Sequence, residues 1–178
     1  MGFLLLSSGA LAPHAYAEAS AIPSYTVTLT AYNAVPAQTD SNPFETASGA
    51  YSNPEVVAAR SQDFATELPF GTIIELDGSN VSSGDTCGYG VVASRIGYRV
   101  IEDTMNAKFT KRVDVLLDTK RDYRTTDKGM KNAAQILGVC DGVVIRVVGH
   151  VDINHIPKTQ EELAKLVTGK SNSLAFNK

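Results

Sequence analysis

The sequence lacks an apolar stretch long enough to cross a bilayer, and it has no excess of positive charge. A membrane-spanning helix needs about 20 apolar residues in a row, and the apolar stretch at residues 2–12 is too short. The formal net charge of -3 argues against nucleic acid or an anionic membrane surface as the main partner. No Lys or Arg precedes Arg60. We therefore expect any anion-facing region between Arg95 and Lys131, where basic residues gather.

Cysteine and histidine are also scarce, with two Cys and three His. Two cysteines without a cluster of histidines do not make a zinc site. His150, Asp152 and His155 are an incomplete ligand set, and a solvated segment after the last strand is the better interpretation. We therefore expect no metal and no cofactor.

The N-terminus has the pattern of an export signal. After the apolar stretch, Ala15-Tyr16-Ala17 supplies the small-x-small pattern for cleavage before Glu18. We predict a signal peptide at residues 1–17 and a secreted or cell-envelope protein; a frayed apolar tail is the alternative. In an exported protein, Cys87 and Cys140 are expected to form a disulfide, since both lie beside glycines at strand edges. The alternative is two unpaired, small apolar side chains.

Strands dominate the expected secondary structure. The length of 178 residues predicts one domain, with a linker at 18–24, a β domain at 25–149 and a C-terminal segment at 150–178. No βαβ repeat is visible, which favours a mainly β fold, a small β-barrel with one short helix packed on it. The expected strands are 25–32, 56–59, 73–76, about 89–94, about 97–102, about 112–117 and 143–148, and a long polar loop covers 33–55.

Two segments have helical periodicity. In the first, Thr125 or Thr126 would cap a helix that ends at Gly138, and its apolar positions are Met130, Ala133, Ala134 and Leu137. The second is an amphipathic segment at 158–167. A polar, flexible tail is expected from Thr168 on.

Two aspartates, Asp103 and Asp114, flank a short basic connection that contains Lys108, Lys111 and Arg112. Because strands joined by a short turn lie side by side, both carboxyls are expected to reach one surface patch. Two carboxyls in one patch shift each other's pKa, as acid–base chemistry on a sugar bond requires. The alternative is structural: an Asp at a strand end often binds backbone N–H groups or a nearby Arg.

The polar loop has the composition of a carbohydrate site. It combines hydroxyl and amide groups with the aromatic residues Tyr32 and Phe44, which suit sugar hydroxyls and a sugar face. A solvated, turn-rich loop is the alternative. The residues that we expect to bind substrate are Tyr32, Asp40, Thr46, Ser48, Gly49 and Arg112.

Several short motifs occur in an order that resembles the 3D domain, named for three aspartates: Thr30-Ala31-Tyr32, Thr46-Ala47-Ser48-Gly49, Leu68-Pro69-Phe70-Gly71-Thr72, Glu102-Asp103-Thr104-Met105-Asn106 and Arg112-Val113-Asp114. That domain is similar to the catalytic barrel of membrane-bound lytic transglycosylase A and of stationary-phase-survival proteins. The resemblance implies a double-psi β-barrel that cleaves peptidoglycan between N-acetylmuramic acid and N-acetylglucosamine. It also implies that Asp114 is the acid/base, that Asp103 is its partner, and that Thr46 and Ser48 line the groove.

The chain departs from the family pattern at two places. Thr104-Met105-Asn106 replaces a Gly-Gly segment after the first aspartate, and Val57-Ala58-Ala59-Arg60 has no acid where the third aspartate usually lies, with Asp63 only nearby. The alternatives to a secreted lytic transglycosylase are therefore a non-catalytic barrel that binds cell-wall glycan and a hydrolase that uses water.

Overall fold

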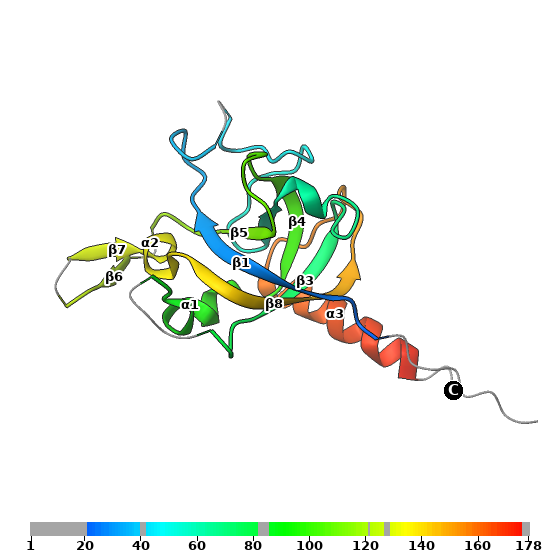
Figure 1. Ribbon diagram of the computed structural model, residues 1–178. Coiled ribbons are helices and arrows are strands. Elements are labelled where there is room, and N and C mark those ends of the chain that lie inside the picture. The colour runs from blue at the N-terminus through cyan, green and yellow to red at the C-terminus, as the bar shows by residue number, and fades with distance from the viewer. Residues whose placement is uncertain (1–20, 40–41, 82–85, 121, 127–128, 176–178) are drawn as a thin grey trace, which may run out of the picture.

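The computed structural model of the chain describes residues 21–39, 42–81, 86–120, 122–126 and 129–175. Its centre is a closed barrel of six strands (Figure 1): β1 (Ser24–Tyr32), β2 (Val57–Arg60), β3 (Thr72–Asp77), β4 (Arg99–Thr104), β5 (Arg112–Leu116) and β8 (Cys140–His150). The prediction of a small, mainly β barrel is confirmed. The expected signal peptide at 1–17 lies outside the described residues.

The strand order is β1-β5-β2-β4-β3-β8. The β1–β5 and β2–β4 pairs are parallel and the other pairs are antiparallel. Because β5 lies between β1 and β2, the chain that joins β1 to β2 must pass over the end of β5. The chain that joins β4 to β5 must likewise pass β2. Two interlocked parallel pairs of this kind form the double-psi arrangement. They also correct one expectation, since β4 and β5 are not neighbours and β2 separates them.

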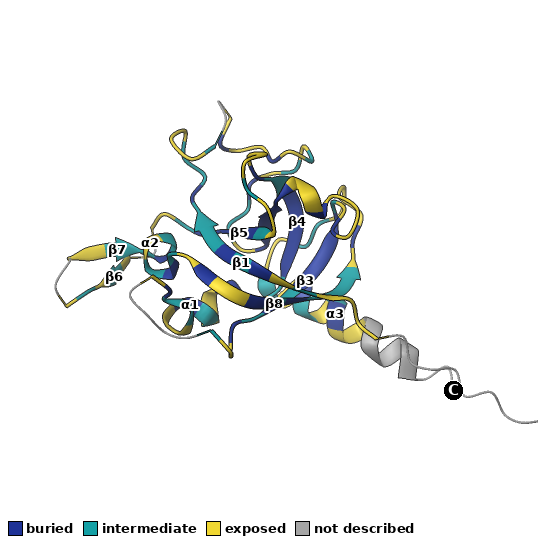
Figure 2. Cartoon of the chain, in the orientation of Figure 1, coloured by how far each residue is buried: buried dark blue, intermediate teal, exposed yellow. Residues whose placement is uncertain are grey.

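The alternation of side chains along the strands divides the core into two parts. Ile74, Ile101 and Val115 belong to the barrel interior, whereas the preceding or following residues Ile73, Val100 and Leu116 lie on the outer face. This is the period of two that a strand imposes. The buried side chains of Leu163 and Val167 from helix α3 (Gln160–Ala175) cover that outer face. Figure 2 shows the resulting buried strands with exposed loops around them.

The segment at 89–94, predicted as a strand, is helical. Helix α1 spans Tyr89–Ile96 and buries Val92 and Ile96, one helical turn apart. A short apolar run has no periodicity that separates a strand from a buried helix. Here the i, i+4 spacing of the two buried side chains fits a helix.

The predicted helix from Thr125 or Thr126 is wrong in its first part and right in its last part. Residues Asp122–Arg124 form β6, which pairs with β7 (Met130–Asn132) in a hairpin that projects from the barrel (Figure 1). Only α2 (Ala133–Leu137) is helical, and its cap is Asn132, whose side chain forms a capping box with Gln135. The expected end at Gly138 is confirmed by its positive φ of 63°. A short 3₁₀ helix, η1, covers Gln62–Phe64.

The C-terminal helix is present but longer than the predicted 158–167. Helix α3 continues to Ala175, through the segment that we expected to be a polar tail. Leu163 is fully buried, so the first half of the helix packs against the barrel. In the described part of the chain, no helix has the length and apolar character to span a membrane.

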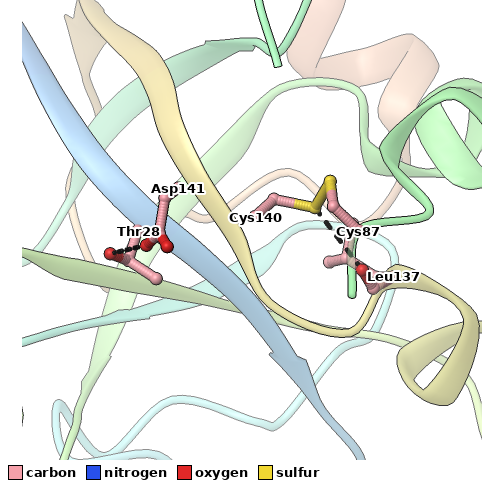
Figure 3. The surroundings of a disulfide bond; sticks show 5 residues. All are labelled: Thr28, Cys87, Leu137, Cys140 and Asp141. Carbon is pink, nitrogen blue, oxygen red and sulfur yellow. Dashed lines mark hydrogen bonds between the residues drawn. A yellow bond between two sulfur atoms is a disulfide. The ribbon is translucent and has the colours of Figure 1, made fainter. Parts of the chain in front are cut away.

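Cys87 and Cys140 form the predicted disulfide, with 4.8 Å between their Cα atoms. The bridge joins the segment before α1 to the first residue of β8, beside Leu137 at the end of α2 (Figure 3). Backbone contacts reinforce it, because Val139 N–H donates to Thr86 O over 2.7 Å. Disulfides persist in oxidising compartments, so this bridge indicates a protein that works outside the reducing cytoplasm.

Candidate functional site

Four strands place one residue each in a row across the barrel wall. Thr30 of β1 pairs with Asp114 of β5, Asp114 pairs with Ala59 of β2, and Ala59 pairs with Asp103 of β4. Neighbouring strands are about 4.8 Å apart, so the two acids are separated by two strand spacings with one alanine between them. The fold therefore brings Asp103 and Asp114 together, although not on adjacent strands as we expected.

A β-bulge turns Asp103 toward the other acid. Ala58 pairs with Ile101 and the next residue, Ala59, pairs with Asp103, so Glu102 is an extra residue in β4. Ile101 points into the barrel core, and regular alternation would give Asp103 the same direction. The bulge instead re-aims Asp103 to the face of Ala59 and Asp114, a use of bulges that is common beside functional sites.

Asp114 has an unusual environment for a carboxyl group. Its side chain is half-buried, and its Oδ1 atom is buried without a hydrogen-bond partner among the described residues. Burial raises the pKa of Asp114 to about 6, against smaller lowering effects from the Thr30 hydroxyl and Arg112. Asp103 adds only a minor upward contribution. Like-charge proximity therefore acts in the expected direction, but loss of solvation is the main cause of the raised pKa.

Asp103, in contrast, is surrounded by donors. Its Oδ1 accepts from Ala47 N–H over 3.0 Å and from Thr104 N–H over 2.8 Å, and its Oδ2 accepts from the Tyr32 hydroxyl over 2.9 Å. Burial and the neighbouring Asp103 raise the pKa of Tyr32 far above its ordinary value, so Tyr32 remains a donor. One carboxyl of the pair is held by three donors and the other has a buried, unpartnered oxygen, which gives them unequal chemistry.

A cleft of about 540 Å³ opens over this row. Tyr32, Asp103 and Asp114 line it, as does Ala47 from the long loop. The remaining lining residues are Gln38, Thr39, Glu45, Ala59, Gln62, Thr104, Met105, Asn106 and Phe109. Met105 and Asn106, which stand where the 3D domain that the motifs resemble has glycines, are therefore among the lining residues. A concave site with a few converging polar groups is the usual form of a small-ligand or glycan site.

Several residues that we expected to bind substrate lie elsewhere. Thr46 and Ser48 do not line the cleft; their hydroxyls are 3.0 Å apart, and the Ser48 hydroxyl donates to Glu102 Oε2 over 2.5 Å. Gly49 closes the same turn with a positive φ of 85°, a conformation that glycine tolerates best. Asp40 lies outside the described residues.

The basic connection borders the cleft through an aromatic ring. The Arg112 guanidinium and the Lys108 ammonium each lie 5.0 Å from the centre of the Phe109 ring, and that ring lines the cleft. Arg112 itself is not among the lining residues. Lys111 has a positive φ of 50°, and its N–H donates to Asp63 Oδ2 over 2.9 Å, so Asp63 organises the connection rather than the acid pair.

Sequence reasoning missed two fully buried charged residues. Glu102 is fully buried beside Asp103. Arg99 is also fully buried, and its guanidinium donates to backbone carbonyls of Ile96, Pro54, Leu116 and Arg95 within 3.1 Å. Burial lowers the pKa of Arg99 to about 10. The signal was present, because the two charged residues directly flank the apolar pair Val100-Ile101 in β4.

His150, which we expected after the last strand, is the final residue of β8, whereas Asp152 and His155 follow the strand. His155 Nδ1 lies 3.1 Å from Asp152 Oδ2, with both side chains largely exposed. Over the described ranges, no group of three or more Asp, Glu, His or Cys residues is arranged to hold a metal ion.

Comparisons with family models, with curated proteins and with solved structures found no match to this chain. The geometry of the cleft and the resemblance of the motifs are therefore the basis for a function.

Proposed function

We propose that the cleft binds a peptidoglycan glycan strand and cleaves the β-1,4 bond between N-acetylmuramic acid and N-acetylglucosamine, as a secreted lytic transglycosylase of the 3D type. The observation that carries the proposal is the state of Asp114. A carboxyl at the cleft with a buried, unpartnered oxygen and a pKa of about 6 holds a proton at mildly acidic pH and can release it. A general acid that later acts as a base requires this property.

The reaction needs a single acid/base. Asp114 donates its proton to the glycosidic oxygen while the bond from that oxygen to the anomeric carbon breaks, and an oxocarbenium-like centre develops. The Asp114 carboxylate then takes the proton of the muramoyl 6-hydroxyl, whose oxygen closes onto the anomeric carbon. The products are a 1,6-anhydro-muramoyl end and a free N-acetylglucosamine hydroxyl, and Asp114 regains its proton.

Asp103 has a different part in this scheme. Its three donors hold the Asp103 carboxylate in one orientation, two strands from Asp114. Such a preorganised charge stabilises the developing positive charge on the sugar ring. Tyr32 orients Asp103 by its hydroxyl, and the Phe109 ring offers an apolar face at the cleft wall.

The test is incubation of the purified protein with peptidoglycan sacculi, followed by mass spectrometry of the released material. We expect anhydro-muropeptides from the unaltered protein and none from Asp114→Asn. Asp122→Asn, at an exposed position of β6, is the matched control and should keep full activity. The rate should fall as the pH rises above about 6, because Asp114 then loses its proton. Undiminished release by Asp114→Asn would remove Asp114 from this role.

A second candidate function is a barrel that binds cell-wall glycan without cleaving it. Two observations favour it. Ala59, not a third acid, lies between Asp103 and Asp114, and Met105 and Asn106, in place of glycines, line the cleft. The same experiment separates the candidates. Sedimentation with sacculi without product release supports binding alone, and products with ordinary reducing ends support a hydrolase. Neither binding nor release would contradict all three.

A further inference from the structure

The wall of the cleft that carries Ala47 is a short hairpin, Phe44–Ser52. Ser52 N–H donates to Phe44 O over 3.0 Å, and Thr46 N–H donates to Ala50 O over 2.9 Å. Ala47 lies at its tip and is exposed, yet its N–H is one of the three donors on Asp103. An exposed tip needs an anchor if it is to hold that hydrogen bond, since ordering a surface segment costs conformational entropy.

Glu102 is placed to be the anchor. It is the extra residue of the bulge in β4, directly before Asp103. Its backbone O accepts from Ser48 N–H over 3.0 Å, and its Oε2 accepts from the Ser48 hydroxyl over 2.5 Å. Ser48 is the residue after Ala47, so two hydrogen bonds to Glu102 fix the backbone beside the donor.

Thr46 completes the contact from the other side of Ala47. It is 5% exposed. Its hydroxyl lies 3.0 Å from the Ser48 hydroxyl and donates to Ala50 O over 3.1 Å. Ala47 is therefore flanked by two hydroxyl side chains that are tied to each other and to Glu102.

We propose that Glu102 is a positioning residue for the acid pair: with Ser48 and Thr46 it forms a buried latch that holds the Phe44–Ser52 hairpin on β4 and so keeps Ala47 N–H on Asp103. The latch is a property of the fold, and its effect on glycan cleavage rests on the proposed function. If the latch opens, Asp103 loses one of its three donors, and the cleft loses the wall formed by Glu45 and Ala47.

The chemistry of Glu102 fits a latch rather than a surface ion pair. It is 0% exposed, and its Oε1 has no hydrogen-bond partner among the described residues. An ionised carboxyl in such a place is costly. Burial raises the pKa of Glu102, with smaller lowering effects from the Ser48 hydroxyl and the Gly71 backbone. An uncharged side chain that keeps a hydrogen-bonding group toward Ser48 should therefore preserve the latch.

The test measures amide hydrogen exchange at Ala47 by NMR on the full ¹⁵N-labelled chain, with Leu29 in β1 as the reference for the whole barrel. Ser48→Ala removes the hydroxyl, and Glu102→Met removes the carboxyl at similar volume. Glu102→Gln keeps a polar end of the same shape. Ser52→Ala removes a hydroxyl from the same hairpin while leaving the Ser52 N–H bond to Phe44 O intact, and it serves as the matched control.

We expect Ser48→Ala and Glu102→Met to lower protection at Ala47 by about tenfold, the factor that one net hydrogen bond typically supplies. Protection at Leu29 should not change in Ser48→Ala. Glu102→Gln and Ser52→Ala should resemble the unaltered chain at Ala47. Unchanged protection at Ala47 in Ser48→Ala would overturn the proposal, as would equal losses in Ser48→Ala and Ser52→Ala. Because this readout needs no substrate, a failure of the latch and a failure of glycan cleavage are distinguishable.

A kinetic arm links the latch to the site where the sacculus assay gives product. We expect Ser48→Ala to lower kcat by about tenfold and to change KM less, because the latch orients Asp103 rather than binding the glycan. A normal kcat in Ser48→Ala, together with lowered protection of the Ala47 amide, would contradict the positioning role.

Discussion

Replacing Asp114 by Asn should stabilise the protein at neutral pH. The pKa of Asp114 is raised from 3.8 to about 6, and each pH unit of difference corresponds to about 1.4 kcal/mol. Keeping this group ionised in the folded protein therefore costs about 3 kcal/mol of the free energy of unfolding at pH 7. An amide avoids that cost but is itself a buried polar group, so we expect a net gain of about 1–2 kcal/mol.

The pH dependence gives the sharper form of this prediction. Between pH 3.8 and about 6 the folded protein binds the Asp114 proton more tightly than the unfolded chain does. The stability of the unaltered protein therefore declines as the pH rises through that window. Asp114→Asn lacks this decline, so its advantage should be small at pH 4 and largest at pH 7.

Differential scanning calorimetry measures the effect directly. A gain of about 1–2 kcal/mol raises the Tm of a chain of this length by about 2–8 °C. Asp122→Asn, at an exposed position on β6, should shift the Tm little at either pH. A lower Tm for Asp114→Asn at pH 7, or a difference that does not vary with pH, would refute the assignment of Asp114 as a carboxyl destabilised by burial.

Three other predictions concern stability. Asp103→Asn should lower the free energy of unfolding by about 1–3 kcal/mol, because Tyr32 and two backbone donors would then face an amide; urea titration at pH 7 measures it, and an unchanged midpoint would contradict it. Reduction of Cys87–Cys140, which closes a loop with a sequence separation of 53, should cost about 4 kcal/mol by loop entropy, seen as a lower Tm in reductant. Leu163→Ala should cost about 2–5 kcal/mol, because this fully buried side chain holds α3 on the barrel; chemical denaturation would show no loss if α3 were only loosely attached.

The strands of the barrel could be predicted where apolar and polar residues alternate with a clear period of two. The segment 25–32 alternates along its length, and it is strand β1 in the structure. The segment 89–94 has adjacent β-branched residues, Val91 and Val92, which favour a strand locally. The segment is a helix because Val92 and Ile96 are buried on one side of it. Which elements pack against that side cannot be predicted from the local sequence pattern. The β6–β7 hairpin was not predicted for a related reason. Met130 fits the spacing of an apolar helix face, but in the structure it is an exposed residue of a strand.

The two acids of the site could be predicted from the sequence, but the residues that position them could not. The spacing of Asp103 and Asp114 around a basic connection indicated a pair, and the structure brings them to one cleft. The bulge at Glu102 has no local sequence signature, and its partner Ser48 is 54 residues away. The place of Ala59 between the acids appears only from the cross-strand register. What the sequence could not supply was therefore the set of long-range pairings.

The interlocked strand order has a consequence for the nascent chain. Thr30 and Asp114 belong to strands that are far apart in the sequence, and Asp103 meets Tyr32 across 71 residues. Such non-local pairing is slow and comes late in folding. No fragment that ends before β5 contains both acids, and no half of the barrel can form the row across β1, β5, β2 and β4. The site is thus absent from every partly synthesised chain that ends before β5, and it forms only once β1, β2, β4 and β5 have paired.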